Sequence, residues 1–66
     1  MKITSKSQLI LTTFTIEDKN GNEYVVFHDP EPPLDQPVFT VNDEDDNEID
    51  GELREQLIKL VIPKLK

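Results

Sequence analysis

The sequence predicts an α+β fold: a small antiparallel β-sheet, made of a hairpin plus a third short strand, with one C-terminal α-helix packed on one face. Two observations and one packing argument predict this class. Two segments rich in β-formers flank an Asn-Gly pair, the strongest short-range hairpin signal. Apolar residues recur at helical spacing near the end of the chain. Packing the helix on the sheet buries the apolar side of both.

The chain has 66 residues, enough for one domain, residues 1–66, with a thin core. A domain of this size buries only about 60% of the surface that its unfolded chain exposes. Without cysteine, neither a disulfide nor a thiolate metal site adds stability. Either the core is well packed, or a second copy or a partner covers apolar surface. An exposed sheet edge is a natural seam for this, so we expect a homodimer.

The strongest strand prediction covers residues 8–17, which are rich in β-branched and aromatic side chains. Residues 1–6, before it, are expected to be a polar, flexible lead-in. Alternating residues share one face of the strand: Ile10, Thr12, Phe14 and Ile16.

The hairpin turn is expected at Asn20-Gly21, with residues 23–28 as the return strand. We prefer a two-residue loop, because it places two apolar pairs on one face: Ile16 with Val25, and Phe14 with Phe27.

A three-residue loop with Gly21 in a bulge is the alternative register. It pairs Ile16 with Tyr24 and Phe14 with Val26. It also turns the other face of the second strand inward, because a one-residue slip exchanges the faces.

Residues 29–37 hold four of the five prolines and predict a stiff, extended connector. Residues 38–41 then predict a third short strand, with Phe39 and Val41 on one face. No internal repeat is expected.

The C-terminal helix is predicted from apolar residues at helical spacing: Ile49, Leu53, Leu57, Leu60 and Val61. Asn47 or Asp50 is the expected N-cap, and Pro63 is expected to end the helix at about Ile62. We expect the apolar stripe to face the core.

Fourteen acidic residues against seven basic ones give a net charge of −7. This charge disfavours nucleic acid and anionic membranes as partners, and favours basic proteins. The longest apolar runs are too short for a membrane span or a signal peptide, so a cytoplasmic location is expected.

No residue pattern predicts an enzyme or a cofactor site. The single histidine, His28, has no cysteine partner, and the chain contains neither a G-x-G-x-x-G motif nor a P-loop. A structural or surface role is expected for His28.

The acidic segment, residues 42–52, is the most informative part of the sequence. Residues 43–55 hold eight of the fourteen acids, with Arg54 as the only cation. In an extended chain, alternate carboxylates would lie about 6.6 Å apart on one side, comparable to the charges of a nucleic-acid backbone. We expect these carboxylates to bind a basic protein: Asp43, Glu44, Asp45, Asp46, Glu48, Asp50, Glu52 and Glu55.

In size, charge and lack of cysteine, the chain resembles virus-encoded DNA-mimic inhibitors. The resemblance implies a non-enzymatic inhibitor that occupies the basic surface of a nucleic-acid-binding protein. The alternative is a small adaptor or subunit that docks through apolar helix or edge-strand contacts, with the acids serving only solubility.

A metal site is the weakest of the readings. Asp43, Asp45 and Asn47 have the alternate spacing that opens a calcium loop. The sixth position of that loop should be glycine and is Glu48, and the twelfth should be glutamate and is Arg54. No specific metal is therefore expected, and weak calcium binding stays open.

Overall fold

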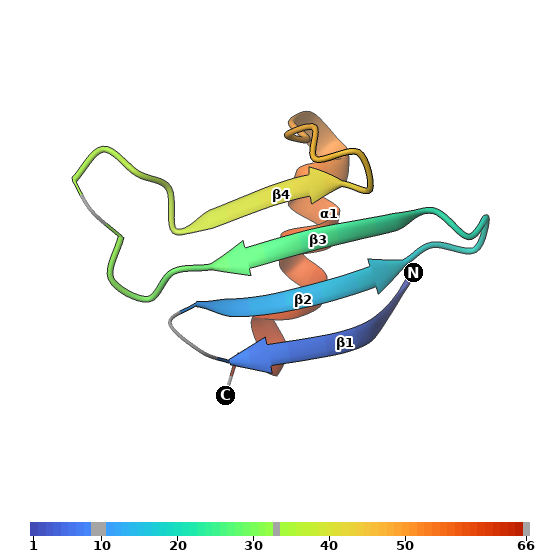
Figure 1. Cartoon of the computed structure of the whole chain (residues 1–66), viewed down its shortest axis with the longest axis horizontal. Helices are drawn as coiled ribbons and strands as arrows, with labels where there is room; N and C mark the ends of the chain where they lie inside the picture. Colours follow the sequence, from blue (N-terminus) through green and yellow to red (C-terminus); the bar gives the residue numbers. More distant parts are fainter. Residues whose placement is uncertain (9–10, 33, 66) are drawn as a thin grey trace.

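The computed structural model describes residues 1–8, 11–32 and 34–65, and it confirms the α+β class (Figure 1). Four strands form one antiparallel sheet in the order β1-β2-β3-β4, and a C-terminal helix packs on one face. The strands are β1 (Lys2–Gln8), β2 (Thr12–Glu17), β3 (Glu23–His28) and β4 (Phe39–Asp43). The helix is α1 (Gly51–Val61), followed by the 3-10 turn η1 (Ile62–Lys64).

The first strand corrects the prediction that residues 1–6 are a flexible lead-in. Lys2–Gln8 pairs antiparallel with β2 along its length. The single strand predicted over residues 8–17 is therefore divided, because β1 ends at Gln8 and β2 begins at Thr12. Leu9 and the predicted inward residue Ile10 lie outside the described residues.

The pattern of β1 is hard to recognise because this is an edge strand with one apolar side chain. Ile3 packs against the core, and the strand is otherwise exposed. A bulge between Ile3 and Ser5 then breaks the two-residue alternation, which puts Lys6 and Gln8 opposite the inward residues of β2.

The preferred hairpin register is wrong, and the alternative is confirmed. Ile16 pairs with Tyr24 and Phe14 with Val26. The loop has three residues at its tip, with Gly21 at a φ of 85°. The inward face of β3 therefore holds Val26, which is fully buried, rather than the apolar pairs that favoured the other register.

The strand predicted at residues 38–41 is β4, with Val41 buried and Phe39 packed against the core. The connector before it includes bends and a turn in which Asp35 has a φ of 72°, so it is not one extended run. Asp50 is the N-cap of α1. The helix ends one residue before the predicted Ile62, and Pro63 lies within η1.

The core lies between the sheet and α1, so the predicted apolar stripe mainly faces inward. Figure 1 shows α1 crossing behind the strands, from the β4 side to the β1 side. Each fully buried side chain of this size contributes about 1.5–3 kcal/mol. The buried residues are Phe14, Ile16, Val26, Val41, Leu57, Ile58 and Val61. Among the described residues, no helix has the length and apolar character to cross a membrane.

Candidate acidic binding surface

The acidic segment is a tight turn rather than an extended row. The backbone N–H of Asp43 donates to the carbonyl of Asn47 at 2.9 Å, and the N–H of Asp46 donates to the carbonyl of Asp43 at 3.1 Å. The chain therefore reverses within residues 43–47, and Glu48 forms an antiparallel bridge back to Asn42. The alternate carboxylate spacing expected of an extended chain is wrong for this part of the segment.

The side chain of Asp43 shapes this turn. Its Oδ1 accepts the backbone N–H of Asp45 and that of Asn47, both at 2.9 Å. An aspartate that accepts N–H groups of the residues after it is a standard way to fix a turn. Asp43 is half-buried, so among the eight predicted residues it is the one that the turn itself uses.

The hairpin turn between β2 and β3 has the same four hydrogen bonds from backbone N–H groups. Asp18 Oδ1 accepts the N–H of Asn20 at 2.8 Å and that of Asn22 at 2.9 Å. The N–H of Asp18 donates to the carbonyl of Asn22 at 2.9 Å, and that of Gly21 to the carbonyl of Asp18 at 3.1 Å. The fourth residue has positive φ in both turns: 85° at Gly21 and 65° at Asp46.

This likeness extends to the sequence and corrects the expectation that the chain has no internal repeat. Each residue of 14–24 corresponds to the residue 25 positions later, in 39–49. Five positions are identical, and they are Phe14/Phe39, Thr15/Thr40, Asp18/Asp43, Asn22/Asn47 and Glu23/Glu48. The signal that could have revealed the repeat is the spacing Phe-Thr-x-x-Asp-x-x-x-Asn-Glu. It is hard to recognise because the tip residues differ completely, Lys19-Asn20-Gly21 in the first copy and Glu44-Asp45-Asp46 in the second.

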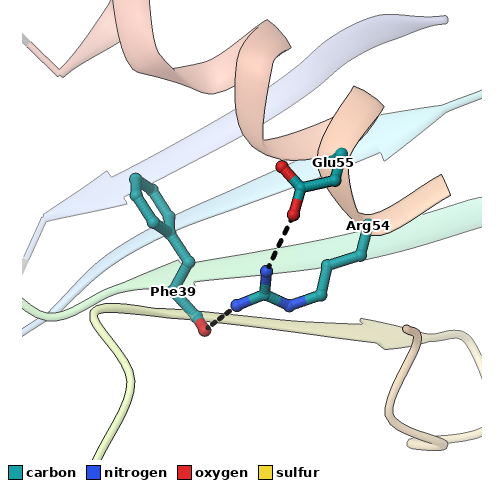
Figure 2. A network of polar contacts seen from close by, with 3 residues as sticks. All are labelled: Phe39, Arg54 and Glu55. Atoms are coloured by element: carbon teal, nitrogen blue, oxygen red, sulfur yellow. Dashed lines mark hydrogen bonds and ion pairs between the residues drawn. The ribbon is translucent and has the colours of Figure 1, made fainter. Parts of the chain in front are cut away.

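The remaining predicted carboxylates are exposed, and they are Glu44, Asp45, Asp46, Glu48, Asp50, Glu52 and Glu55. Within the part of the chain that the structure describes, Arg54 makes the single ion pair, with Glu55 at 3.6 Å (Figure 2). The second terminal nitrogen of its guanidinium group, Nη2, donates to the carbonyl of Phe39 at 3.1 Å, which links α1 to β4. No described lysine neutralises the acidic segment.

A groove of about 250 Å³ between the two turns joins the acidic segment to the first hairpin; its lining residues are Asn22, Glu23, Tyr24, Asp43, Glu44 and Asp45. The two turns lie at the same end of the sheet (Figure 1). Sequence reasoning missed Glu23 and Tyr24, because they join the acidic segment only through strand pairing. Tyr24 lies opposite Asp43 in the β3–β4 ladder.

The titration of Tyr24 reports on both turns. Burial raises the pKa of its phenol above 10.0, and so do the nearby charge of Asp18, the hydrogen bond to Asp18, and the charges of Glu44 and Asp43. For Asp18 itself, burial works to raise the pKa of the carboxyl, but it is outweighed by hydrogen bonds from Asn22, Asn20 and Tyr24, which lower it below 3.8.

The weak calcium candidates Asp43, Asp45 and Asn47 all belong to the second turn. Asp43 already accepts the N–H groups of Asp45 and Asn47. Among residues 1–8, 11–32 and 34–65, no three His, Cys, Asp or Glu side chains are grouped to hold a metal ion. His28 lies against Phe39, with the two ring centres 5.0 Å apart.

Comparison with protein-family models, with curated proteins and with solved structures finds no match to this chain.

Proposed function

We propose that this chain is a non-enzymatic binding module whose acidic surface docks a basic protein. The acidic surface comprises the exposed carboxylates of the second turn and of the segment that leads into α1, which are Glu44, Asp45, Asp46, Glu48 and Asp50. We further propose that the partner binds nucleic acid and that the acidic surface occupies its nucleic-acid site, as a DNA-mimic inhibitor does. Fixed negative charges steer such a partner and compete with phosphates. A cytoplasmic location and a homodimer remain predictions.

The difference between the two turns carries the proposal. Both turns have the same four hydrogen bonds from backbone N–H groups, so this pattern forms with different residues at the tip. The first tip, Lys19-Asn20-Gly21, has a formal charge of +1, whereas the second, Glu44-Asp45-Asp46, has −3. Because the same hydrogen-bond pattern forms with a basic tip, the carboxylates of the second tip are not required for it.

The second turn also has a backbone cost. Asp46 has a φ of 65°, in the left-handed region that glycine adopts freely. For a residue with a side chain, this conformation costs about 1–2 kcal/mol, less for Asp and Asn. The first turn has Gly21 at the same position. Asp46 therefore occupies a position that glycine would fit better. This supports the proposal that its charge serves binding rather than folding.

Exchanging the tips tests the proposal. Glu44→Lys, Asp45→Asn and Asp46→Gly place the first tip on the second turn, and we expect the fold to be retained with equal or higher thermal stability. Proteins that the wild type retains from lysate at low salt should be lost. Each retained protein is then purified and assayed for DNA binding, which wild-type chain should reduce and the variant should not.

A charge-matched control separates position from net charge. Adding Lys19→Glu, Asn20→Asp and Gly21→Asp to the first exchange restores the net charge of −7 but moves the acidic tip to residues 19–21. If this double exchange competes with DNA as well as wild type does, total charge is sufficient and the proposed surface is wrong. Competition should also weaken as salt rises.

The adaptor reading is the second candidate. Burial of Leu57, Ile58 and Val61 leaves the helix stripe in the core, which removes most of the apolar helix face from docking. A groove of about 340 Å³ at the other end of the sheet favours the adaptor instead; its lining combines the apolar Leu11, Phe27, Leu34, Pro37 and Val38 with the polar Asp29, Gln36 and Thr40. Retention of partners by the first exchange variant at high salt would support this second candidate.

A further inference from the structure

The two outer edges of the sheet are in different states. On β4, the N–H of Ile49 donates to the carbonyl of Val41 at 2.8 Å. The guanidinium of Arg54 donates to the carbonyl of Phe39 at 3.1 Å (Figure 2). The N–H of Asp43 donates to the carbonyl of Asn47 at 2.9 Å. Three outward backbone groups of β4 are therefore satisfied within the chain, and this edge is closed to another strand.

The outer edge of β1 has no such cover. The hydrogen bond from Asp18 to Asn22 fixes the even-numbered residues of β2 as those whose backbone groups point to β3. Odd-numbered residues of β2 therefore bond to their β1 partners. The β1 residues opposite the even-numbered residues of β2 point their backbone groups outward, and they are Ile3, Lys6 and Gln8. In the described part of the chain, no backbone hydrogen bond covers this outer side.

The surroundings of β1 are basic although the chain is acidic. Residues 1–8 contain Lys2 and Lys6 and no acid. The 3-10 turn η1 adds Lys64, because Lys6 Nζ donates to the carbonyl of Lys64 at 2.6 Å. The closest strand-paired acid is Glu17, opposite Lys2.

The acidic surface is too distant to cancel this charge. Three strand spacings separate β1 from β4, about 14 Å. At physiological ionic strength the screening length is about 8 Å. The β1 edge therefore presents a local positive charge to any strand that approaches it.

We propose that the outer edge of β1 binds an extended segment of a partner protein that has acidic side chains at alternate positions. The segment adds a fifth strand to the sheet. Outward backbone groups of Ile3, Lys6 and Gln8 supply the hydrogen bonds, as in other cases of strand addition. Acidic side chains on the helix side of the added strand lie beside Lys6. This binding is independent of the proposed function of the acidic surface.

Charge selects this occupant over a second copy of the chain. An antiparallel pairing of two β1 edges centred on Lys6 places the Lys6 residues of the two copies opposite each other, and like charges in that position are unfavourable. Lysines on an edge strand generally discourage pairing with another strand. Here they discourage neutral or basic strands and favour an acidic one.

Two blocked seven-residue peptides test the proposal, one alternating Glu with Val and the other alternating Lys with Val. Binding to the full chain is followed by nuclear magnetic resonance at physiological salt. We expect the Glu peptide to bind about tenfold more tightly than the Lys peptide. Its binding should slow amide hydrogen exchange at Ile3, Lys6 and Gln8 and leave the β4 amides unchanged.

Two variants at Lys6 separate the contribution of the side-chain charge to peptide binding from that of the backbone N–H. Lys6→Gln keeps the outward N–H, and it should reduce the preference for the Glu peptide severalfold. Lys6→Pro removes that N–H without removing a hydrogen bond to β2, since edge strands tolerate proline with the N–H side outward. It should lower affinity by a further tenfold or more.

Three outcomes would overturn the proposal even if Lys6→Pro does not fold. The first is that both peptides bind the wild type equally well. The second is that the Glu peptide does not slow amide hydrogen exchange at Ile3, Lys6 and Gln8. The third is that, without any peptide, exchange at these amides slows as the concentration of the protein rises. The last outcome would assign the edge to a second copy of the chain.

Discussion

The turns at residues 18–22 and 43–47 have the same pattern of backbone hydrogen bonds, and they differ in what surrounds them. The first joins two central strands, β2 and β3. The second follows the edge strand β4, and the chain then makes one bridge and leaves to form α1. The same local motif is thus used once inside the sheet and once at its border.

This comparison separates what a turn needs from what its position adds. Asp at the first position, Asn at the fifth and positive φ at the fourth occur in both turns. Burial differs: Phe14 is fully buried, whereas its counterpart Phe39 is half-buried beside His28. Local hydrogen bonds determine the turn, and the neighbouring strands determine how much each copy contributes to stability.

The largest expected effect is at the paired phenylalanines. Phe14→Ala should lower the free energy of unfolding by about 3–5 kcal/mol, because it empties a fully buried site. A domain of this size has only about 3–10 kcal/mol of stability. Phe39→Ala should cost clearly less. Urea unfolding followed by circular dichroism measures both, and equal losses would contradict the difference between centre and edge.

The paired aspartates give the next largest effect. Asp43→Ala leaves two N–H groups of the turn without their acceptor and should cost about 1 kcal/mol. Asp18→Ala should lower the melting temperature further, because Asp18 also accepts hydrogen bonds from the Asn22 side chain and from Tyr24.

The Asp18 effect should depend on pH with a defined sign. Its folded pKa is lowered from 3.8, so its stabilisation is fully present above that value and is lost as the pH falls through the lowered pKa. The gap in melting temperature between wild type and Asp18→Ala should therefore shrink in acid. A gap that grows in acid would contradict these hydrogen bonds.

The smallest effect is a spectroscopic one at Tyr24, the only tyrosine in a chain without tryptophan. Glu44→Gln should lower the phenol pKa from its raised value, because the Glu44 charge contributes to the rise. Absorbance of the phenolate measures it, with Glu31→Gln in the proline-rich connector as control. In wild type, the stabilisation linked to this group is present below pH 10.0 and lost as the pH rises through the raised pKa. An unchanged pKa in Glu44→Gln would contradict the proximity of the second turn to Tyr24.

Strong local signals were read correctly from the sequence. The helix follows from apolar spacing and from the effect of Pro63 on its end, and the hairpin turn follows from Asn20-Gly21. Asp50 lies at the N-cap position as predicted, although its side chain makes no capping hydrogen bond. The exposure of the acidic segment follows from its density of charge. The two-residue register failed because pairing by apolar content ignored the hydrogen bonds that Asp18 makes within the loop.

The amino-acid sequence by itself determined the class of the fold, the helix and the place of the negative charge, because each depends on periodicity or composition within a short window. Only the tertiary structure decided that β1 is a strand, that the acidic segment is a turn, and that Tyr24 and Glu23 lie beside it. Those features depend on which strand lies next to which. Pairing between distant residues leaves little trace in local sequence, above all at an edge strand with one apolar side chain.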